Sequence, residues 1–175
     1  GGIPVCCGAV PTPALCLYAY GQSIPSLMVT GSHIPADRNG IKFNRTNGEF
    51  LKPDETSMRE QNVEIPEYLL DKKGFLRQPL SLPPLVYVKL DYLSRYRDFF
   101  GKTALSGLTL GIYQHSAVGR DILVEIVKAL GAKAIPLGRQ ETFISVDTEA
   151  VREEDQKLAK DWAAGQHLDA ILTTD

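Results

Sequence analysis

The sequence predicts an α/β protein in two parts, an irregular first half and a regularly alternating second half. Residues 1–82 hold eight of the eleven prolines and many Gly and Asn turn residues. Residues 83–175 instead alternate short apolar runs with longer amphipathic stretches. That alternation reads β-α-β-α-β, which predicts a parallel sheet with right-handed crossovers.

In the first half, proline and glycine mark where the elements begin and end. Proline is tolerated in the first turn of a helix, so Pro11 is expected to open a helix that runs to about Tyr20. Pro53-Asp54-Glu55 predicts a second helix start, because acidic residues in the first turn interact favourably with the helix dipole. The remaining segments are expected to be a short buried strand at 3–7, strands at 25–30 and 40–45, a loop at 31–39 and weak structure at 63–81.

In the second half, Pro83 and Pro84 are expected to open a helix that reaches Phe100 and bridges the two halves. The next helix is expected at 119–130, with Gly131 as its C-cap. The last is expected to begin at Asp147 or Thr148, as a cap, and to run to about Ala164. The strands are predicted at 108–113, 132–137 and 168–174.

Ligands of parallel sheets bind beyond the carboxyl ends of the strands. Three polar stretches occupy such strand ends: 31–39, 115–120 and Asp175. In the second of them Ser116 precedes a helix whose N-terminus could bind an anion. The favoured interpretation is structural, with Ser116 as the N-cap and Gly119 allowing close packing.

The bulk composition argues against several classes of partner. The net charge of −2, with no basic stripe, is not typical of a nucleic-acid-binding protein. The chain has neither an apolar run of about 18 residues nor a signal-peptide pattern, so no membrane partner is expected. The three cysteines Cys6, Cys7 and Cys16 are odd in number and have no zinc-ligand spacing, which predicts buried or partly buried free thiols in a reducing compartment. A cytoplasmic location is therefore expected.

The sharpest motif is Thr30-Gly31-Ser32-His33-Ile34-Pro35, followed by Asn39-Gly40-Ile41-Lys42. A serine exposed in a Gly- and Pro-containing loop at a strand end is a candidate nucleophile or phosphoryl carrier. A phosphoserine carries a charge of about −1.5 to −2 and needs compensating cations, which His33 and Lys42 could supply. Lys42 could also carry a proton.

This block resembles the phosphoserine signature of the α-D-phosphohexomutases. The segment 8–13 (GAVPTP) is similar to the stretch that precedes this signature, and 131–137 and 169–175 fit the second domain of the family. The resemblance implies that phosphorylated Ser32 donates its phosphoryl group to a hexose phosphate. The resulting bisphosphorylated sugar then reorients and returns its other phosphoryl group. Ser32, His33 and Lys42 are the implied catalytic residues, and His33, Asn39 and Lys42 the implied substrate-binding residues.

The resemblance also implies two three-layer α/β/α domains with mixed or mainly parallel sheets, both incomplete here: 1–82 with the phosphoserine loop and 83–175 truncated at a metal loop. In the family, an Asp-Gly-Asp-x-Asp-Arg loop binds Mg²⁺ together with a phosphoserine oxygen, a ligand set that suits this hard cation. Asp175 matches the first aspartate, so Ser32 and Asp175 are the implied metal ligands and Mg²⁺ the implied cofactor. The remaining domains of the same polypeptide are implied partners, and these 175 residues alone are expected to lack turnover.

Several alternatives stay open at this point. Phosphoglucosamine mutase is the rival activity within the family. A non-catalytic sugar-phosphate-binding paralogue gains support from Ile34, which stands where the family usually has Asn. A serine hydrolase is disfavoured, because no G-x-S-x-G elbow surrounds Ser32.

Overall fold

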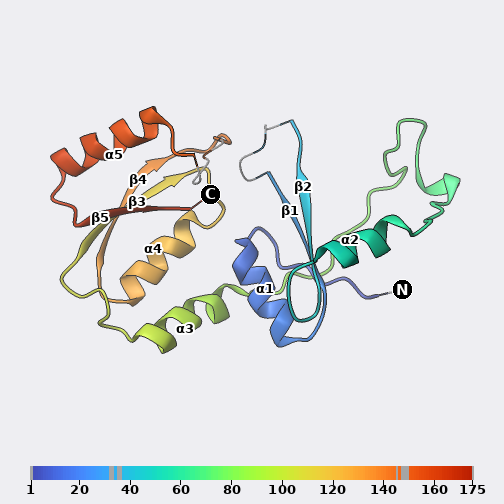
Figure 1. Cartoon of the computed structure of the whole chain (residues 1–175), viewed down its shortest axis with the longest axis horizontal. Coiled ribbons are helices and arrows are strands. Elements are labelled where there is room, and N and C mark those ends of the chain that lie inside the picture. Colours follow the sequence, from blue (N-terminus) through green and yellow to red (C-terminus); the bar gives the residue numbers. More distant parts are fainter. Residues whose placement is uncertain (1, 32–33, 35–36, 145, 147–149, 175) are drawn as a thin grey trace.

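The computed structural model describes residues 2–31, 34, 37–144, 146 and 150–174. These residues form an α/β structure with one antiparallel and one parallel sheet, which confirms the predicted class. Figure 1 shows the parallel sheet with its helices on one side of the molecule and the antiparallel hairpin near the middle. The segment that contains α2 extends away on the far side of the hairpin.

The first half is built from α1 (Thr12–Gly21) and a hairpin of β1 (Ser26–Thr30) and β2 (Gly40–Asn44). Thr30 lies opposite Gly40 and Met28 opposite Lys42 in the antiparallel register. The hairpin is followed by α2 (Lys52–Arg59) and the short 3₁₀ helix η1 (Glu67–Leu69). The predicted helices and the two strands of the hairpin are therefore confirmed, with shifts of one or two residues at their ends.

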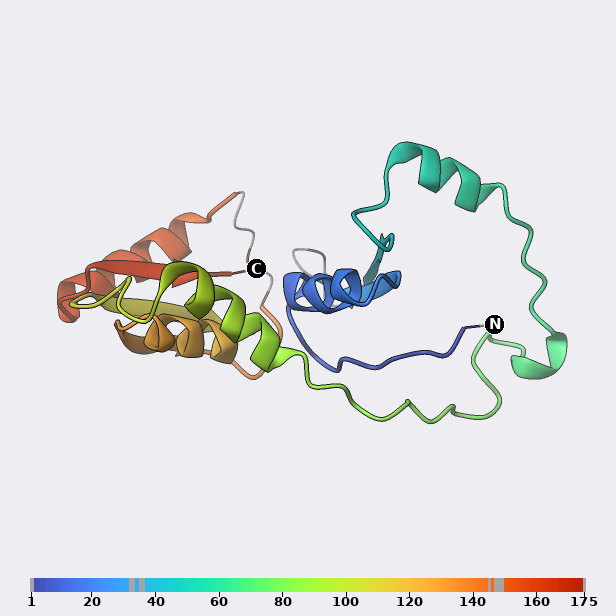
Figure 2. The same ribbon diagram turned by 90° about the horizontal axis from the view of Figure 1, so that it is seen from below.

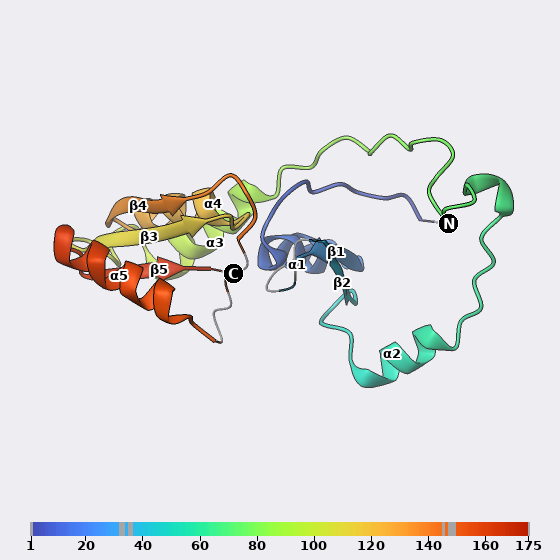
Figure 3. The ribbon, with the colours of Figure 1, turned by 90° about the horizontal axis from the view of Figure 1, so that it is seen from above.

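The second half is a parallel sheet in which β3 (Thr109–His115) lies between β4 (Lys133–Arg139) and β5 (Ala170–Thr173). Figures 1 and 3 show α4 (Arg120–Ala129) on one face of this sheet and α5 (Glu153–Gly165) on the other. The predicted parallel β-α-β-α-β order is confirmed, and it forms three α/β/α layers. Tyr113 and Trp162 pack with ring centroids 5.1 Å apart, on the side that α5 covers.

Helix α4 joins the two halves, because it is buried on two sides. One side packs against α1 and α3 (Lys89–Phe100) in a cluster formed by Val10, Ala14, Val88, Tyr92, Ile122, Ile126 and Leu130. The other side packs on the sheet in a cluster formed by Leu110, Ile112, Val124, Val127 and Ala132. A helix with apolar residues over so much of its circumference is a core element. Through α4, the first half, which contains α1 and the hairpin, is held against the parallel sheet of the second half.

The predicted strand at 3–7 is wrong. Cys6 makes only an isolated parallel bridge with Leu85, and Val86 N–H donates to the Cys6 carbonyl at 2.8 Å. Figure 2 shows these two extended segments running side by side. The side chain of Ile3 is 93% exposed. A strand needs a neighbour along its length, and the hairpin lies across α1 from this segment.

The predicted start of this helix was Pro83, but α3 begins at Lys89. The same pairing explains the difference. Leu85 and Val86 are held extended by Cys6, so helix geometry becomes available only after them. The start of α5 was also predicted too early, since its N-cap is Arg152. Arg152 Nε lies 2.8 Å from an Asp155 carboxylate oxygen, and the acidic first turn favours that start. The predicted caps Asp147 and Thr148 lie outside the described residues.

The predicted C-cap of α4 is off by one residue, because the C-cap is Leu130 and not Gly131. Gly131 follows it with φ +96°, a conformation that glycine adopts without a steric cost. All three cysteines are free and partly buried, and burial raises the pKa of the Cys7 thiol. No helix in the described part of the chain is both long and apolar enough to cross a bilayer.

Candidate functional site

The loop after β1 carries the residues that the motif singles out. Ser32 and His33 lie outside the described residues, and so does Asp175. The structure does describe Gly31 and Ile34. The backbone N–H of Ile34 donates a hydrogen bond to the Gly31 carbonyl at 2.8 Å. This bond uses only the backbone of Ile34, so it does not depend on which side chain stands at position 34.

Lys42 and Asn39 both lie at the base of this loop. Because side chains alternate along a strand and Lys42 pairs with Met28, Lys42 shares one face of the hairpin with Met28 and Thr30. Asn39 directly precedes β2, and a Cβ added to Gly31 would lie 3.7 Å from its Oδ1. The hairpin thus brings two of the predicted site residues close to the residues that flank Ser32.

A cavity of about 350 Å³ opens beneath this face of the hairpin. Thr30 and Lys42 line it from the hairpin, Gly119 from the start of α4, and Thr174 from the end of β5. Thr30 lies two residues before Ser32, and Thr174 directly precedes Asp175. The two chain segments that lead to the predicted phosphoserine and to the predicted metal ligand therefore meet at one cavity.

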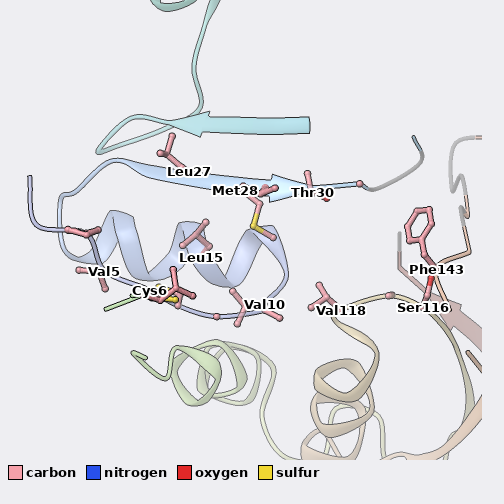
Figure 4. Close-up of a pocket in the computed structure, with 18 of the residues that line it drawn as sticks. Val5, Cys6, Val10, Leu15, Leu27, Met28, Thr30, Ser116, Val118 and Phe143 are labelled. Carbon is pink, nitrogen blue, oxygen red and sulfur yellow. The ribbon is translucent and has the colours of Figure 1, made fainter. Parts of the chain in front are cut away.

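A larger cavity of about 580 Å³ adjoins the first and is mostly apolar. Figure 4 shows Met28 of β1 pointing toward Leu15 and Val10, with Val118 and Phe143 beyond the end of β1. Both cavities share Met28, Thr30 and Val118 among their lining residues. Since apolar walls offer a sugar few hydrogen bonds, the first cavity, which Thr30, Lys42 and Thr174 line, is the one suited to a phosphorylated ligand.

The carboxyl end of β3 holds His115, the first residue of the polar stretch 115–120, for which the sequence predicts no role of its own. Its side chain is buried, with 2% of the residue exposed, and its Nε2 lies 2.6 Å from the Thr174 carbonyl oxygen. The His115 carbonyl accepts hydrogen bonds from Gln140 N at 2.9 Å and from Arg120 Nη1 at 3.1 Å. The only feature of the sequence that pointed to a role for His115 is its position at the end of a predicted buried strand.

Ser116 is not the N-cap of α4, so that interpretation was wrong. The cap position is Gly119, and the Ser116 hydroxyl instead donates to the Ile144 carbonyl at 3.1 Å and accepts from Ile144 N at 2.8 Å. The predicted close packing at Gly119 is confirmed, because a Cβ there would lie 3.1 Å from Pro11 Cγ. Ser116 therefore ties the loop after β4 to the end of β3.

The arginines at this edge of the sheet are engaged by carboxylates. Arg139 bonds Asp121 at 2.7 Å and Glu141 at 3.0 Å, and these bonds hold the pKa values of both carboxyl groups below their usual range. Arg120 bonds Glu141 at 3.3 Å. Of the described residues that line the two cavities, Lys42 is the one lysine or arginine.

No group of three His, Cys, Asp or Glu side chains that could hold a metal occurs within the described parts of the chain. The predicted ligands Ser32 and Asp175 lie outside those parts. Both offer oxygen atoms, which suit Mg²⁺. Thr30, two residues before Ser32, and Thr174, directly before Asp175, line the same cavity.

Comparison with known proteins identifies the family of this fold and loop. Residues 3–67 match the family model described as phosphoglucomutase/phosphomannomutase, alpha/beta/alpha domain I. A phosphomannomutase of Sinorhizobium fredii is 43% identical over 178 residues, which cover 100% of this chain and 36% of that protein. A phosphomannomutase of Salmonella muenchen is 39% identical over 168 residues, which cover 96% of this chain and 33% of that protein.

A phosphoglucosamine mutase of Solibacter usitatus is more distant, at 29% identity over 134 residues, which cover 74% of this chain and 28% of that protein. The chain thus spans about a third of the length of the curated phosphomannomutases that it matches. The identity to them extends through both sheets. On these matches, the chain belongs to the phosphoglucomutase/phosphomannomutase family, the α-D-phosphohexomutases.

Proposed function

We propose that the protein containing this chain is a phosphohexomutase that interconverts hexose 1-phosphate and hexose 6-phosphate through a phosphoserine at Ser32. The observation that carries the proposal is the cavity shared by Thr30, Lys42 and Thr174. It supports a site in which the Ser32 loop, a cation and the chain leading to Asp175 come together. The identity to phosphomannomutases over the whole chain supports the same activity.

The proposed reaction moves phosphoryl groups between Ser32 and the sugar in two steps. In the first, a sugar hydroxyl oxygen bonds to the phosphorus and gives its proton to a nearby base, while the bond from phosphorus to Ser32 Oγ breaks and Ser32 Oγ takes up a proton. The bisphosphorylated sugar then reorients. In the second step Ser32 Oγ gives up its proton and bonds to the other phosphorus, while the bond from that phosphorus to the sugar oxygen breaks and the sugar oxygen takes up a proton.

Lys42 and His33 are the proposed proton carriers and contacts to the phosphoryl oxygens. Lys42 is exposed in β2 on the face that lines the cavity, so it can reach a ligand there. Asn39 is the proposed hydrogen-bonding residue for the substrate, because its amide lies beside Gly31. Fixed cations and donors around a transferring phosphoryl group stabilise the charge of its transition state.

Members of this family are generally metal-dependent, and Mg²⁺ is the proposed cofactor here. Ser32 and Asp175 would hold the ion. When bound, the ion would neutralise charge on the transferring phosphoryl group. The proposed domains are 1–82 with the phosphoserine loop and 83–175 with the approach to the metal loop. The remaining domains of the same polypeptide are the proposed partners of both.

A mannose or glucose phosphate is the preferred substrate class, and a glucosamine phosphate is the second candidate. The phosphomannomutases match at 39–43% identity over 96–100% of this chain, whereas the phosphoglucosamine mutase of Solibacter usitatus matches at 29% over 74%. A comparison of kcat/KM for mannose 1-phosphate and glucosamine 1-phosphate with the intact enzyme would separate them.

The first test of the mechanism is Ser32→Ala in the intact enzyme. Turnover should fall by more than about a thousandfold, because no phosphoryl carrier remains. Ser57→Ala is the matched control, since Ser57 is an exposed serine on α2, and it should keep wild-type turnover. Mass spectrometry of the wild-type enzyme should find the phosphate on the peptide that contains Ser32. Wild-type activity in Ser32→Ala would refute the phosphoserine mechanism, and an inactive enzyme that is never phosphorylated would favour the non-catalytic paralogue.

A further inference from the structure

We propose that His115 is a positioning residue that holds the end of β5, and through it Asp175, in place for metal binding. This inference rests on the proposed function, in which Asp175 is a metal ligand. Neither the motif nor the comparisons assign a role to His115. The inference starts from what attaches the end of β5 to the sheet.

The backbone pairing of β5 with β3 ends before Thr174, the residue that precedes Asp175. The last pair in the register is Tyr113 with Thr173, and the Thr173 hydroxyl donates to the Tyr113 carbonyl at 3.2 Å. The next attachment is the hydrogen bond of 2.6 Å between His115 Nε2 and the Thr174 carbonyl oxygen. Because a carbonyl can only accept, Nε2 carries the proton and donates it. Thr174 is thus tied to the central strand by this side chain.

His115 is itself held firmly in an unusual conformation. Its φ of +28° lies in a region that residues other than glycine seldom adopt. Its carbonyl accepts from Gln140 N and from Arg120 Nη1, and Arg120 Nη1 also donates to the Gln140 carbonyl at 2.5 Å. Surrounding bonds of this kind sustain backbone strain, which is concentrated at functional sites. They fix the direction in which the imidazole ring leaves the strand.

The ring has a feature that argues against a purely space-filling role. Among the described residues, His115 Nδ1 is buried and has no hydrogen-bond partner. A buried polar atom without a partner destabilises a fold, so an apolar ring of similar size would pack at lower cost. What the imidazole supplies and an apolar ring cannot is the Nε2 hydrogen bond to Thr174.

The position of that hydrogen bond connects it to the proposed site. Thr174 lines the cavity of about 350 Å³ together with Thr30 and Lys42. His115 lines the adjoining cavity together with Gly31, the residue before Ser32. Loss of the bond would free Thr174 to move relative to the hairpin. The direct consequence would be weaker metal binding, since outer contacts orient metal ligands.

The test compares His115→Phe with His115→Gln in the full-length enzyme. Phenylalanine keeps the ring and removes the donor, whereas the Gln amide nitrogen lies at about the same reach as Nε2. The affinity for Mn²⁺, used as a probe and measured by electron paramagnetic resonance without substrate, should fall about tenfold or more in His115→Phe and return most of the way in His115→Gln. The KM for sugar phosphate should stay within about twofold of wild type in both variants, because His115 is not a substrate contact.

Ile112→Val is the matched control for simple destabilisation. Ile112 is fully buried in the same strand, so the shorter side chain should lower Tm without changing the Mn²⁺ affinity. If His115→Phe binds Mn²⁺ like wild type, or if Ile112→Val weakens Mn²⁺ as much at an equal loss of Tm, the inference is wrong. If His115→Phe does not fold, His115→Asn takes its place, because its amide is too short to reach Thr174.

The inference and the proposed function can fail separately. A wild-type enzyme that is phosphorylated on Ser32 but binds no divalent metal would overturn the role of His115 and leave phosphoryl transfer by Ser32 standing. A full-length protein that binds Mn²⁺ with the expected His115 dependence, yet stays active as Ser32→Ala, would refute the phosphoserine mechanism and leave the positioning role intact.

Discussion

Among single residues, Lys42 has the position that most directly bears on the proposed phosphoryl transfer. It is exposed on the hairpin face that also carries Thr30, and it lines the cavity that Thr174 reaches. Lys42→Met should therefore lower kcat about a hundredfold or more, as expected for loss of the proposed proton carrier and contact to the phosphoryl oxygens. The measurement is steady-state turnover of the intact enzyme with a saturating hexose phosphate.

The matched control is Lys52→Met. Lys52 lies on α2, where it pairs with Glu55 at 2.8 Å and its side chain is 88% exposed. Its replacement removes the same charge at a distance from the hairpin face and should change kcat by less than about twofold, because exposed ion pairs contribute little. Equal effects of the two substitutions would show that Lys42 acts only through the overall charge of the protein.

The motif could predict that Lys42 and Asn39 lie near the residues that flank Ser32, because all of them belong to one antiparallel hairpin of two strands that are consecutive in the sequence. It could not find the role of His115, because the contact with Thr174 joins positions 59 apart through the register of β3 and β5. Ser116 was misassigned for a related reason. Serine is favoured at N-caps, but a distant backbone, that of Ile144, offers the hydroxyl both an acceptor and a donor.

At the scale of elements, α4 is the helix on which the site depends, and Gly131 shapes its end. The φ of Gly131 is +96°, and a Cβ there would lie 2.8 Å from the Lys102 carbonyl oxygen. Gly131→Ala should therefore destabilise the protein by about 1 to 3 kcal/mol, since both the backbone conformation and the contact oppose a side chain. Urea unfolding of the intact protein, followed by circular dichroism, measures this loss.

Gly165→Ala is the corresponding control at the end of α5. Gly165 has no positive φ, and a Cβ there meets nothing within 4 Å. Alanine should then leave stability unchanged or raise it by up to about 1 kcal/mol, because it reduces the freedom of the unfolded chain. A Gly131→Ala variant as stable as Gly165→Ala would mean that the turn after α4 rearranges at no cost.

The spacing of apolar residues and the positions of proline and glycine predicted α1, α4 and the three parallel strands, because the local sequence of each element is enough to determine its conformation. The failures occur where a distant segment decides the conformation. Residues 3–7 look like a strand but have only Leu85 to pair with, and that same pairing delays α3 until Lys89. Pro83 and Pro84 are suited to the first turn of a helix. The pairing of Leu85 with Cys6 nevertheless keeps this segment extended.

At the scale of the whole molecule, the hairpin presents an apolar outer face. Leu27, Val29 and Ile41 are 62%, 63% and 57% exposed on the side away from Lys42. Adjacent exposed apolar side chains of this kind mark surfaces that other protein segments cover. The chain spans about a third of its curated relatives, so the proposed remaining domains of the same polypeptide are the natural cover for this face.

Charge at the same scale predicts that the 175-residue chain, produced by itself, has no measurable mutase turnover. The proposed intermediate carries two phosphate groups, together about −3 to −4 in charge. Lys42 is the only lysine or arginine among the described residues that line the two cavities next to Gly31. Lys42 and the proposed Mg²⁺ both act on the phosphoryl group at Ser32, and the described lining offers no further lysine or arginine for the second phosphate. That phosphate must therefore be held by groups outside these cavities.

The assay uses mannose 1-phosphate and Mg²⁺, with the intact enzyme as the positive control and circular dichroism to establish that the chain is folded. A folded chain should give only the background rate, even if Ser32 can be phosphorylated within it. Turnover within tenfold of the intact enzyme would contradict the charge argument. It would mean that residues outside the described part of the chain complete the phosphate site, and that the further domains serve only to select the sugar.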